Sequence, residues 1–155
     1  MRRSCPLDSE DTTLHKRSTC GAVAPGALAA AKWDGEDDDL GVRRVVPDLA
    51  SVSLEVAISF YGNVLGLQPV MDHGWIVTLA DPERPGVQMS LMTRDATAPV
   101  IPDASIQVDD VDSCYAAAVR AGAEIVHPLT DEPWGVRRFF VRDPDGHVLN
   151  VLSHS

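Results

Sequence analysis

The sequence predicts an α+β domain made of two βαβββ modules, which pair to form a half-open, barrel-like sheet with helices on its outside. Two observations support this prediction. From residue 43 onward, the same order of strand and helix signals occurs twice, at a spacing of about 60 residues. Several of the strand segments also alternate polar and apolar residues, which gives a sheet one polar and one apolar face.

The first 42 residues have a different composition from the rest of the chain. They are rich in Ser, Thr, Asp, Pro and Gly, and they include an acidic run at residues 36–39. Such a segment buries too little apolar surface to offset the entropy that it loses on ordering. We therefore predict a disordered N-terminal extension over residues 1–42 and a folded domain over residues 43–155.

The first module begins with a predicted strand at residues 43–49, followed by a helix that Ser53 caps and Gly66 ends. One face of this helix carries apolar side chains at positions i, i+4, i+7 and i+11, and we expect it to be buried. These residues are Leu54, Ile58, Tyr61 and Leu65. The remaining strands are predicted at residues 68–71, 75–80 and 87–93, and a hairpin joins the first two.

The second module repeats this order after a proline-bounded connection. A strand is predicted at residues 104–108, and a helix then begins at Asp110 and ends at Gly122. The buried face of this helix is predicted to carry Val111, Tyr115, Ala118 and Val119, and Cys114 on the same helix is expected to be a small packed residue. Three strands complete the module at residues 124–126, 136–141 and 147–152.

Alternation along the strands indicates which side chains face the concave side of the sheet. In residues 103–108 the even positions are apolar and the odd positions are polar, while Leu149 and Val151 flank Asn150. Since successive side chains on a strand point to opposite faces, the apolar set is expected to pack against the helices. The polar set then lines the concavity, which is the natural place for a ligand.

Charge and cysteine content exclude several classes of protein. The net charge is −10 at pH 7 without a basic stripe, which argues against nucleic acid or an anionic membrane as a partner. No apolar run approaches the roughly 20 residues that a membrane-spanning helix needs. The three cysteines form no CxxC pair and no disulfide framework, and no apolar signal segment follows the N-terminus, so we expect a cytoplasmic protein.

Four short motifs resemble those of the vicinal-oxygen-chelate superfamily, which includes glyoxalases, dioxygenases and bleomycin-resistance proteins. They lie in both halves of the chain and in the order expected for the family. The motifs are Phe60-Tyr61-Gly62-Asn63-Val64-Leu65-Gly66-Leu67, Val108-Asp109-Asp110-Val111-Asp112 with Ala121-Gly122-Ala123, Pro133-Trp134-Gly135, and Asp143-Pro144-Asp145-Gly146-His147. The resemblance covers about residues 43–153 and implies paired βαβββ modules around a small-molecule site. It also implies a homodimer.

Enzymes of this family hold a divalent metal ion with His, Glu or Gln side chains from four strands, and the resemblance implies where those ligands would fall here. The positions are Val46, Gln88, a position near Asp103, and Asn150. An apolar residue, two amides and one carboxylate make a poor site for a divalent ion. We therefore expect no metal and no other cofactor.

The polar residues predicted to line the ligand cavity are Gln88, Ser90, Asp103, Arg138 and Asn150. Arg137 and Arg138 differ in strand parity, so one of them should face the cavity, where it could bind a carboxylate, a phosphate or a polarised carbonyl. A salt bridge to Asp103 or Asp131 is an equal alternative. The four histidines outside the extension are interpreted as surface residues: His73, His127, His147 and His154.

Three functions are compatible with the sequence. The leading hypothesis is a metal-free small-molecule-binding protein that is similar to the bleomycin-resistance branch. The second is a glyoxalase- or dioxygenase-like enzyme acting on a small oxygenated substrate, with an unusual ligand set or none. The third is a structural or regulatory module. No catalytic residue can be assigned, because the sequence contains no recognisable nucleophile or phosphate-loop motif.

Overall fold

Two helices and eight strands make up the part of the chain that the computed structural model describes, residues 40–154. The first module consists of β1 (Val42–Ala50), α1 (Leu54–Leu65), β2 (Gln68–Asp72), β3 (Ile76–Ala80) and β4 (Gln88–Met92). The second consists of β5 (Ala104–Val108), α2 (Val111–Arg120), β6 (Glu124–Glu132), β7 (Val136–Arg142) and β8 (Val148–His154). The repeated βαβββ order predicted from the sequence is confirmed.

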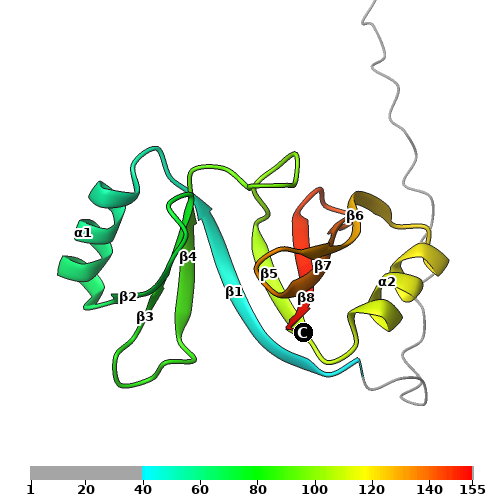
Figure 1. Ribbon diagram of the computed structural model, residues 1–155, viewed down its shortest axis with the longest axis horizontal. Helices are drawn as coiled ribbons and strands as arrows, with labels where there is room; N and C mark the ends of the chain where they lie inside the picture. The colour runs from blue at the N-terminus through cyan, green and yellow to red at the C-terminus, as the bar shows by residue number, and fades with distance from the viewer. Residues whose placement is uncertain (1–39, 155) are drawn as a thin grey trace, which may run out of the picture. The chain divides into compact units, whose positions relative to one another are not determined.

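The strands form one mixed sheet in the order β2-β3-β4-β1-β5-β8-β7-β6, and the first strands of the two modules meet in the middle. β1 and β5 are antiparallel, with Val46 opposite Ser105, whereas β1–β4 and β5–β8 are parallel. The sheet is curved and open, with α1 outside the first module and α2 outside the second (Figure 1). Both modules therefore contribute to the concave face.

Helix α1 begins and ends at the predicted residues. The Ser53 hydroxyl accepts a hydrogen bond from the Val56 amide, and Gly66 takes a left-handed conformation with φ = 72°. Its inner face packs on buried residues of β3 and β4 and carries Leu54, Ala57, Ile58 and Tyr61. The prediction for Leu65 is wrong, because this side chain is 60% exposed at the last helical position. Leu67, just after the turn, packs against the cluster instead.

Helix α2 covers the second module in the same way. Asp110 caps it by accepting a hydrogen bond from the Ser113 amide, as predicted. Val111, Cys114, Tyr115 and Ala118 contact a core that includes the fully buried Phe139. Val119 was expected on this face, but it is 52% exposed because its position near the helix end lies on the flank of the contact.

The strand alternation separates the two faces of the sheet as predicted. Ile106 and Val151 belong to the core beneath α2, while their neighbours Ser105 and Asn150 line a cavity on the concave side. β6 is much longer than the predicted segment 124–126, since it continues through irregular pairing with β7 to Glu132. The predicted extension, residues 1–42, lies outside the described residues except for its last three positions.

Candidate functional site

A cavity of about 180 Å³ lies on the concave face of the sheet and is lined by both modules. Its apolar wall consists of Val46, Met71, Trp75, Ile76, Met92, Trp134, Val136 and Leu152. Its polar wall consists of Arg44, His73, Thr78, Gln88, Ser90, Ser105, Arg138, Asn150 and His154. A mostly apolar hollow with a few converging polar groups has the character of a small-molecule site.

Arg44 and Gln88 form a polar pair on the first module's side of the cavity. Arg44 Nη1 donates a hydrogen bond to Gln88 Oε1 over 2.8 Å, and Gln88 Nε2 donates to the Pro85 carbonyl. Arg44 Nε is buried and has no hydrogen-bond partner in the structure. Since an unmet buried donor is costly, this nitrogen is a natural contact for an acceptor atom of a ligand.

Three side chains from three adjacent strands form a hydrogen-bonded chain at the wall of the cavity. Asn150 Nδ2 donates to Ser105 Oγ over 2.8 Å, and Ser105 Oγ donates to Asp48 Oδ2 over 2.6 Å. Asp48 is 4% exposed and lies behind Ser105, outside the ring of lining residues. Asp48 Oδ1 and Asn150 Oδ1 are both buried without a hydrogen-bond partner.

Burial makes the Asp48 carboxyl group a weaker acid than an exposed aspartic acid. Loss of hydration disfavours its charged form and raises its pKa from 3.8 to about 6, although the hydrogen bond from Ser105 works in the opposite direction. The negative charge of Asp95 raises this pKa further, and the positive charge of Arg138 lowers it. A carboxyl group with a pKa near 6 exchanges its proton close to neutral pH, and such groups are often functional.

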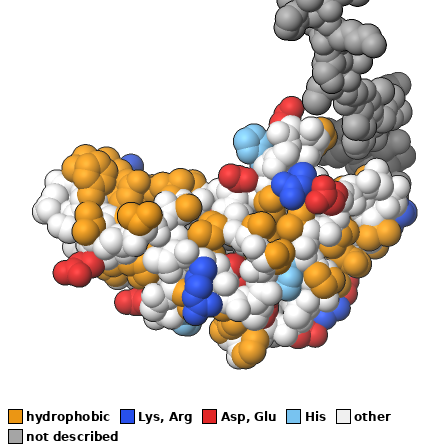
Figure 2. All heavy atoms as spheres, turned by 90° about the horizontal axis from the view of Figure 1, so that it is seen from above, with side chains coloured by type: hydrophobic (Ala, Val, Ile, Leu, Met, Phe, Trp, Pro, Cys, Tyr) orange, Lys and Arg blue, Asp and Glu red, His pale blue; other side chains and the backbone are white. Residues whose placement is uncertain are grey.

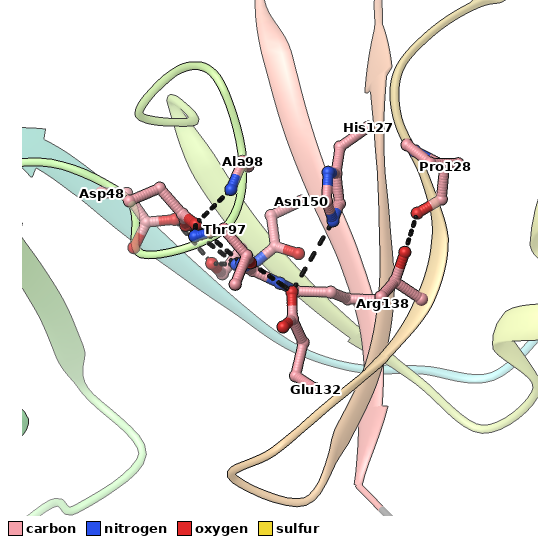
Figure 3. A network of polar contacts seen from close by, with 11 residues as sticks. Asp48, Thr97, Ala98, His127, Pro128, Glu132, Arg138 and Asn150 are labelled. Atoms are coloured by element: carbon pink, nitrogen blue, oxygen red, sulfur yellow. Dashed lines mark hydrogen bonds and ion pairs between the residues drawn. The ribbon is translucent and has the colours of Figure 1, made fainter.

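Arg138 is the centre of a buried ion-pair network (Figure 3). Its guanidinium forms two hydrogen bonds with the Asp95 carboxylate, at 2.7 and 2.9 Å, and one with Glu132 Oε1 at 2.7 Å. Burial alone would raise the pKa of Asp95, but hydrogen bonds from Arg138 and from the Thr97 and Ala98 amides hold it below its usual value. The charge of Arg138 is therefore already neutralised by protein carboxylates.

Aromatic rings surround the same arginine. Its guanidinium carbon lies 5.3 Å from the centroid of Trp134 and 4.9 Å from that of Phe140. Trp134 lies in the β6–β7 turn, and Trp75 precedes β3 in the first module. The centroids of their rings are 5.8 Å apart. The two indoles thus connect the modules at the cavity wall.

Four of the five polar residues predicted for the cavity line it: Gln88, Ser90, Arg138 and Asn150. Asp103 does not, because it precedes β5 and its carboxylate accepts a hydrogen bond from the Val148 amide. Ser105, two residues further on and on the same face of β5, takes that place. Of the adjacent arginines, Arg138 faces the cavity and Arg137 pairs with Asp112 and Asp131 on the outside.

Sequence reasoning missed several residues of the site and misplaced one. Asp48 has the strand parity of Val46, which could have marked it as facing the concave side. Glu132 and Asp95 carried no comparable signal, since they meet Arg138 only in the folded chain. His127 was predicted to be a surface residue, but it is 8% exposed, and its Nε2 lies 3.6 Å from Glu132 Oε1.

The sequence matches the family model described as the Glyoxalase/Bleomycin resistance protein/Dioxygenase superfamily over residues 44–151. The chain therefore belongs to this superfamily, as the resemblance of its motifs implied. No curated protein matches the sequence.

Solved structures share the fold at low sequence identity. One is described as an NAD-dependent benzaldehyde dehydrogenase from Legionella pneumophila, with a TM-score of 0.58 and 20% identity over 72% of this chain and 99% of that one. A glyoxalase/bleomycin resistance protein/dioxygenase superfamily member from Vibrio splendidus 12B01 has a TM-score of 0.55 and 24% identity, over 71% of this chain and 97% of that one. Methylmalonyl-CoA epimerase from Mycobacterium tuberculosis has a TM-score of 0.57 and 19% identity, over 77% of this chain and 93% of that one.

The cavity does not fit the divalent metal ion of the family's enzymes. At the strand positions that face one another across the concave side, the chain offers Val46, Gln88, Ser105 and Asn150, which together supply no charged or imidazole donor. Within residues 40–154, no three His, Cys, Asp or Glu side chains are grouped closely enough to hold a metal ion. Tight sites for Zn²⁺, Mn²⁺ or Fe²⁺ need several such donors converging on one point.

No helix within residues 40–154 has the length and hydrophobicity to span a membrane.

Proposed function

We propose that this protein binds a small, flat and largely apolar organic molecule in the cavity between its two modules, without a tightly held metal ion. The observation that carries the proposal is the residue set at the wall. Val46, Gln88 and Asn150, the positions at which the family resemblance implies metal ligands, all line the cavity and supply no charged or imidazole donor. Such a protein would be similar in kind to the bleomycin-resistance proteins of the superfamily.

The size and chemistry of the cavity restrict the ligand. An engineered protein cavity of about 150 Å³ holds benzene, so a cavity of about 180 Å³ accommodates one substituted aromatic ring. Trp75, Trp134 and Met92 offer faces against which such a ring packs. Arg44 and Asn150 line the cavity, and each keeps one hydrogen-bonding atom without a protein partner, so we expect a ligand that carries polar groups as well as its ring.

The proposal is tested by thermal unfolding of the full chain after treatment with a chelator, against a panel of aromatic compounds, dicarbonyls and acyl thioesters. A compound that binds the folded state, present at about 100 times its dissociation constant, adds roughly 2.7 kcal/mol of stability. At least one single-ring compound should raise the melting temperature. If no compound of the panel does so, the proposal fails.

Adjacent residues on β1 provide a matched pair of variants for this test. Val46 is 5% exposed in the cavity wall, whereas Val45 is 57% exposed on the opposite face of the strand. Val46→Phe should fill the cavity and abolish stabilisation by the compound, while Val45→Phe should preserve it. Equal responses of the two variants would place the compound elsewhere on the protein.

The absence of tight metal binding has a direct test and a gain-of-function control. Elemental analysis of protein purified without chelators should find no stoichiometric Zn, Ni, Mn or Fe. The double substitution Val46→His with Asn150→Glu supplies two strong donors, so it should create affinity where the parent has none. One ion per parent chain, lost on Gln88→Ala, would favour a metalloenzyme instead.

We further propose that two copies of the chain associate through the outer face of α1. Hydrophobic side chains gather at the end of the molecule where this helix lies (Figure 2). Val52, Val56, Phe60 and Val64 follow one another at intervals of four residues and are all more than half exposed. The corresponding positions of α2 are polar or small, so this apolar stripe is a property of the first module.

A further inference from the structure

The cavity wall contains a buried carboxyl group that the proposed binding function does not require. Asp48 is 4% exposed and lies behind the hydroxyl group of Ser105, which donates a hydrogen bond to it over 2.6 Å. The Ser90 hydroxyl group also lowers the pKa of Asp48 by hydrogen bonding. Asn150, which is 5% exposed, donates to the Ser105 hydroxyl over 2.8 Å and fixes its orientation. The hydroxyl oxygen is thus polarised on one side by a carboxylate and held on the other by an amide.

Unmet hydrogen-bonding capacity at this place indicates that a donor enters from the cavity. Ser105 Oγ already donates to Asp48 and accepts from Asn150, so it retains one lone pair for a further donor. Asn150 Oδ1 and Asp48 Oδ1 are buried without partners. Ser105 lines the cavity, so its free lone pair is the acceptor that a ligand hydroxyl group meets, with the Asp48 carboxylate directly behind it.

We propose that Ser105, Asn150 and Asp48 form a proton-accepting subsite that binds the hydroxyl group of a phenol and takes its proton. This inference rests on the proposed small-molecule function and names the chemical class of its ligand. Ser105 contacts the ligand, and Asp48 acts through Ser105.

The proton moves in two coupled transfers, and no oxidant or reductant is involved. The ligand's O–H bond breaks, its electron pair stays on the phenolic oxygen, and the proton bonds to Ser105 Oγ. The original Ser105 O–H bond breaks at the same time, and that proton bonds to Asp48 Oδ2. The complex then contains a phenolate and a neutral carboxylic acid, so its total charge is unchanged.

Charges around the cavity favour this outcome. Arg44 lines the same cavity with an unpaired Nε, so its positive charge stabilises a phenolate. The charged groups that act on Asp48 are Asp95, which favours protonation of Asp48, and Arg138, which opposes it. The pKa of Asp48, raised to about 6 by burial, brings the carboxyl group close to the acidity of an activated phenol.

The test uses 4-nitrophenol, whose phenol and phenolate forms absorb at different wavelengths, and its methyl ether 4-nitroanisole, which has no proton to give. Full-length protein is mixed with each compound in weakly buffered solution at about pH 6.5, just above the pKa of Asp48. Absorbance reports the form of the bound dye, and a pH indicator counts the protons that reach the solvent. The bound dye should absorb as phenolate while no proton is released.

Two variants and one control isolate the subsite. Asp48→Asn keeps the size of the side chain and a hydrogen-bonding partner for Ser105 but cannot take the proton, and Ser105→Ala removes the relay. In both, the bound dye should stay a phenol or release one proton for each phenolate formed. Asp145→Asn, at an exposed carboxylate, should behave like the parent.

Each contrary result has a distinct meaning. The inference is overturned if the parent binds the dye as a phenol, if it releases one proton per bound dye, or if Asp48→Asn behaves like the parent. Binding of 4-nitroanisole without binding of 4-nitrophenol also overturns it and leaves the proposed function standing. If neither compound binds, the phenol subsite is wrong, and the proposed function is decided by the wider compound panel.

Discussion

At the scale of single residues, the molecule retains charged groups in places where they lower its stability. Asp48 is buried beside neutral hydroxyl groups, and Arg138 requires two buried carboxylates to neutralise it. An apolar or amide residue would satisfy the packing in either place at lower cost. Arg138 lines the cavity and Asp48 lies directly behind the lining residue Ser105, so both charged groups adjoin the proposed ligand site.

The carboxyl group of Asp48 makes stability depend on pH. Its pKa is raised from 3.8 in the unfolded chain to about 6 in the folded protein, so the fold favours the protonated form. This contribution is fully present below pH 3.8 and is lost as the pH rises through about 6. The difference of about two pKa units corresponds to roughly 3 kcal/mol.

Asp48→Asn should therefore raise the free energy of unfolding at pH 8 by up to about 3 kcal/mol, and by much less at pH 4. Urea unfolding at the two pH values measures the effect, with Asp145→Asn as the surface control. If Asp48→Asn changes the free energy of unfolding equally at both pH values, the pKa of the Asp48 carboxyl group is not raised in the folded protein.

Arg137 and Arg138 give a second residue-scale prediction, because two neighbours of the same type lie in opposite environments. Arg138→Met removes the cation from between Asp95 and Glu132, and the uncompensated buried carboxylates should cost about 3–5 kcal/mol. Arg137→Ala breaks two exposed ion pairs and should cost far less, because solvent screens exposed charges. Urea unfolding at neutral pH compares them, and equal losses would mean that the Arg138 network is not formed.

At the scale of elements, capping residues predicted where the helices begin and end, whereas periodicity predicted less accurately which helical side chains are buried. Ser53, Gly66 and Asp110 act through their immediate neighbours, so the helix ends could be predicted from sequence alone. Leu65 and Val119 continue the apolar period of each helix, but both lie near its last turn and are exposed. Periodicity reports the direction of a side chain, whereas burial depends on where the partner surface ends.

The inner face of α1 can be tested with a pair of leucine-sized residues. Ile58 packs against buried residues of β3 and β4, and Leu65 does not. Ile58→Ala should cost about 1–2 kcal/mol, below the 2–5 kcal/mol typical of full burial because the side chain is only partly buried. Leu65→Ala should cost less than about 0.5 kcal/mol. A larger loss at Leu65 in thermal or urea unfolding would show that the helix packs in another orientation.

The outer face of α1 carries the prediction about association. If two copies pack through the apolar stripe, Phe60→Ser should shift the protein from dimer to monomer in light scattering coupled to size-exclusion chromatography. Val119→Ser, at an exposed apolar position on the other helix, is the control. A parent protein that is monomeric at micromolar concentration would contradict this part of the proposal.

At the scale of the whole molecule, the site exists because the two modules meet at β1 and β5. The chain Asp48–Ser105–Asn150 spans residues separated by 57 and then 45 positions, and Arg138 contacts Asp95 across 43. Strand parity could place Gln88, Ser90 and Asn150 on the concave face, because parity is local. It could not pair Asp48 with Ser105 or find the carboxylates around Arg138, because those contacts depend on the register between strands.

We propose above that the cavity between the modules binds a small molecule without a metal ion. The most direct test is a fluorescence titration of the chelator-treated full chain with a stabilising compound from the panel, because Trp75 and Trp134 both line the cavity. Quenching should be saturable with one molecule bound per chain, unchanged by added Zn²⁺ or Ni²⁺ and abolished by Val46→Phe. Quenching that appears only after a divalent metal is added would contradict this proposal.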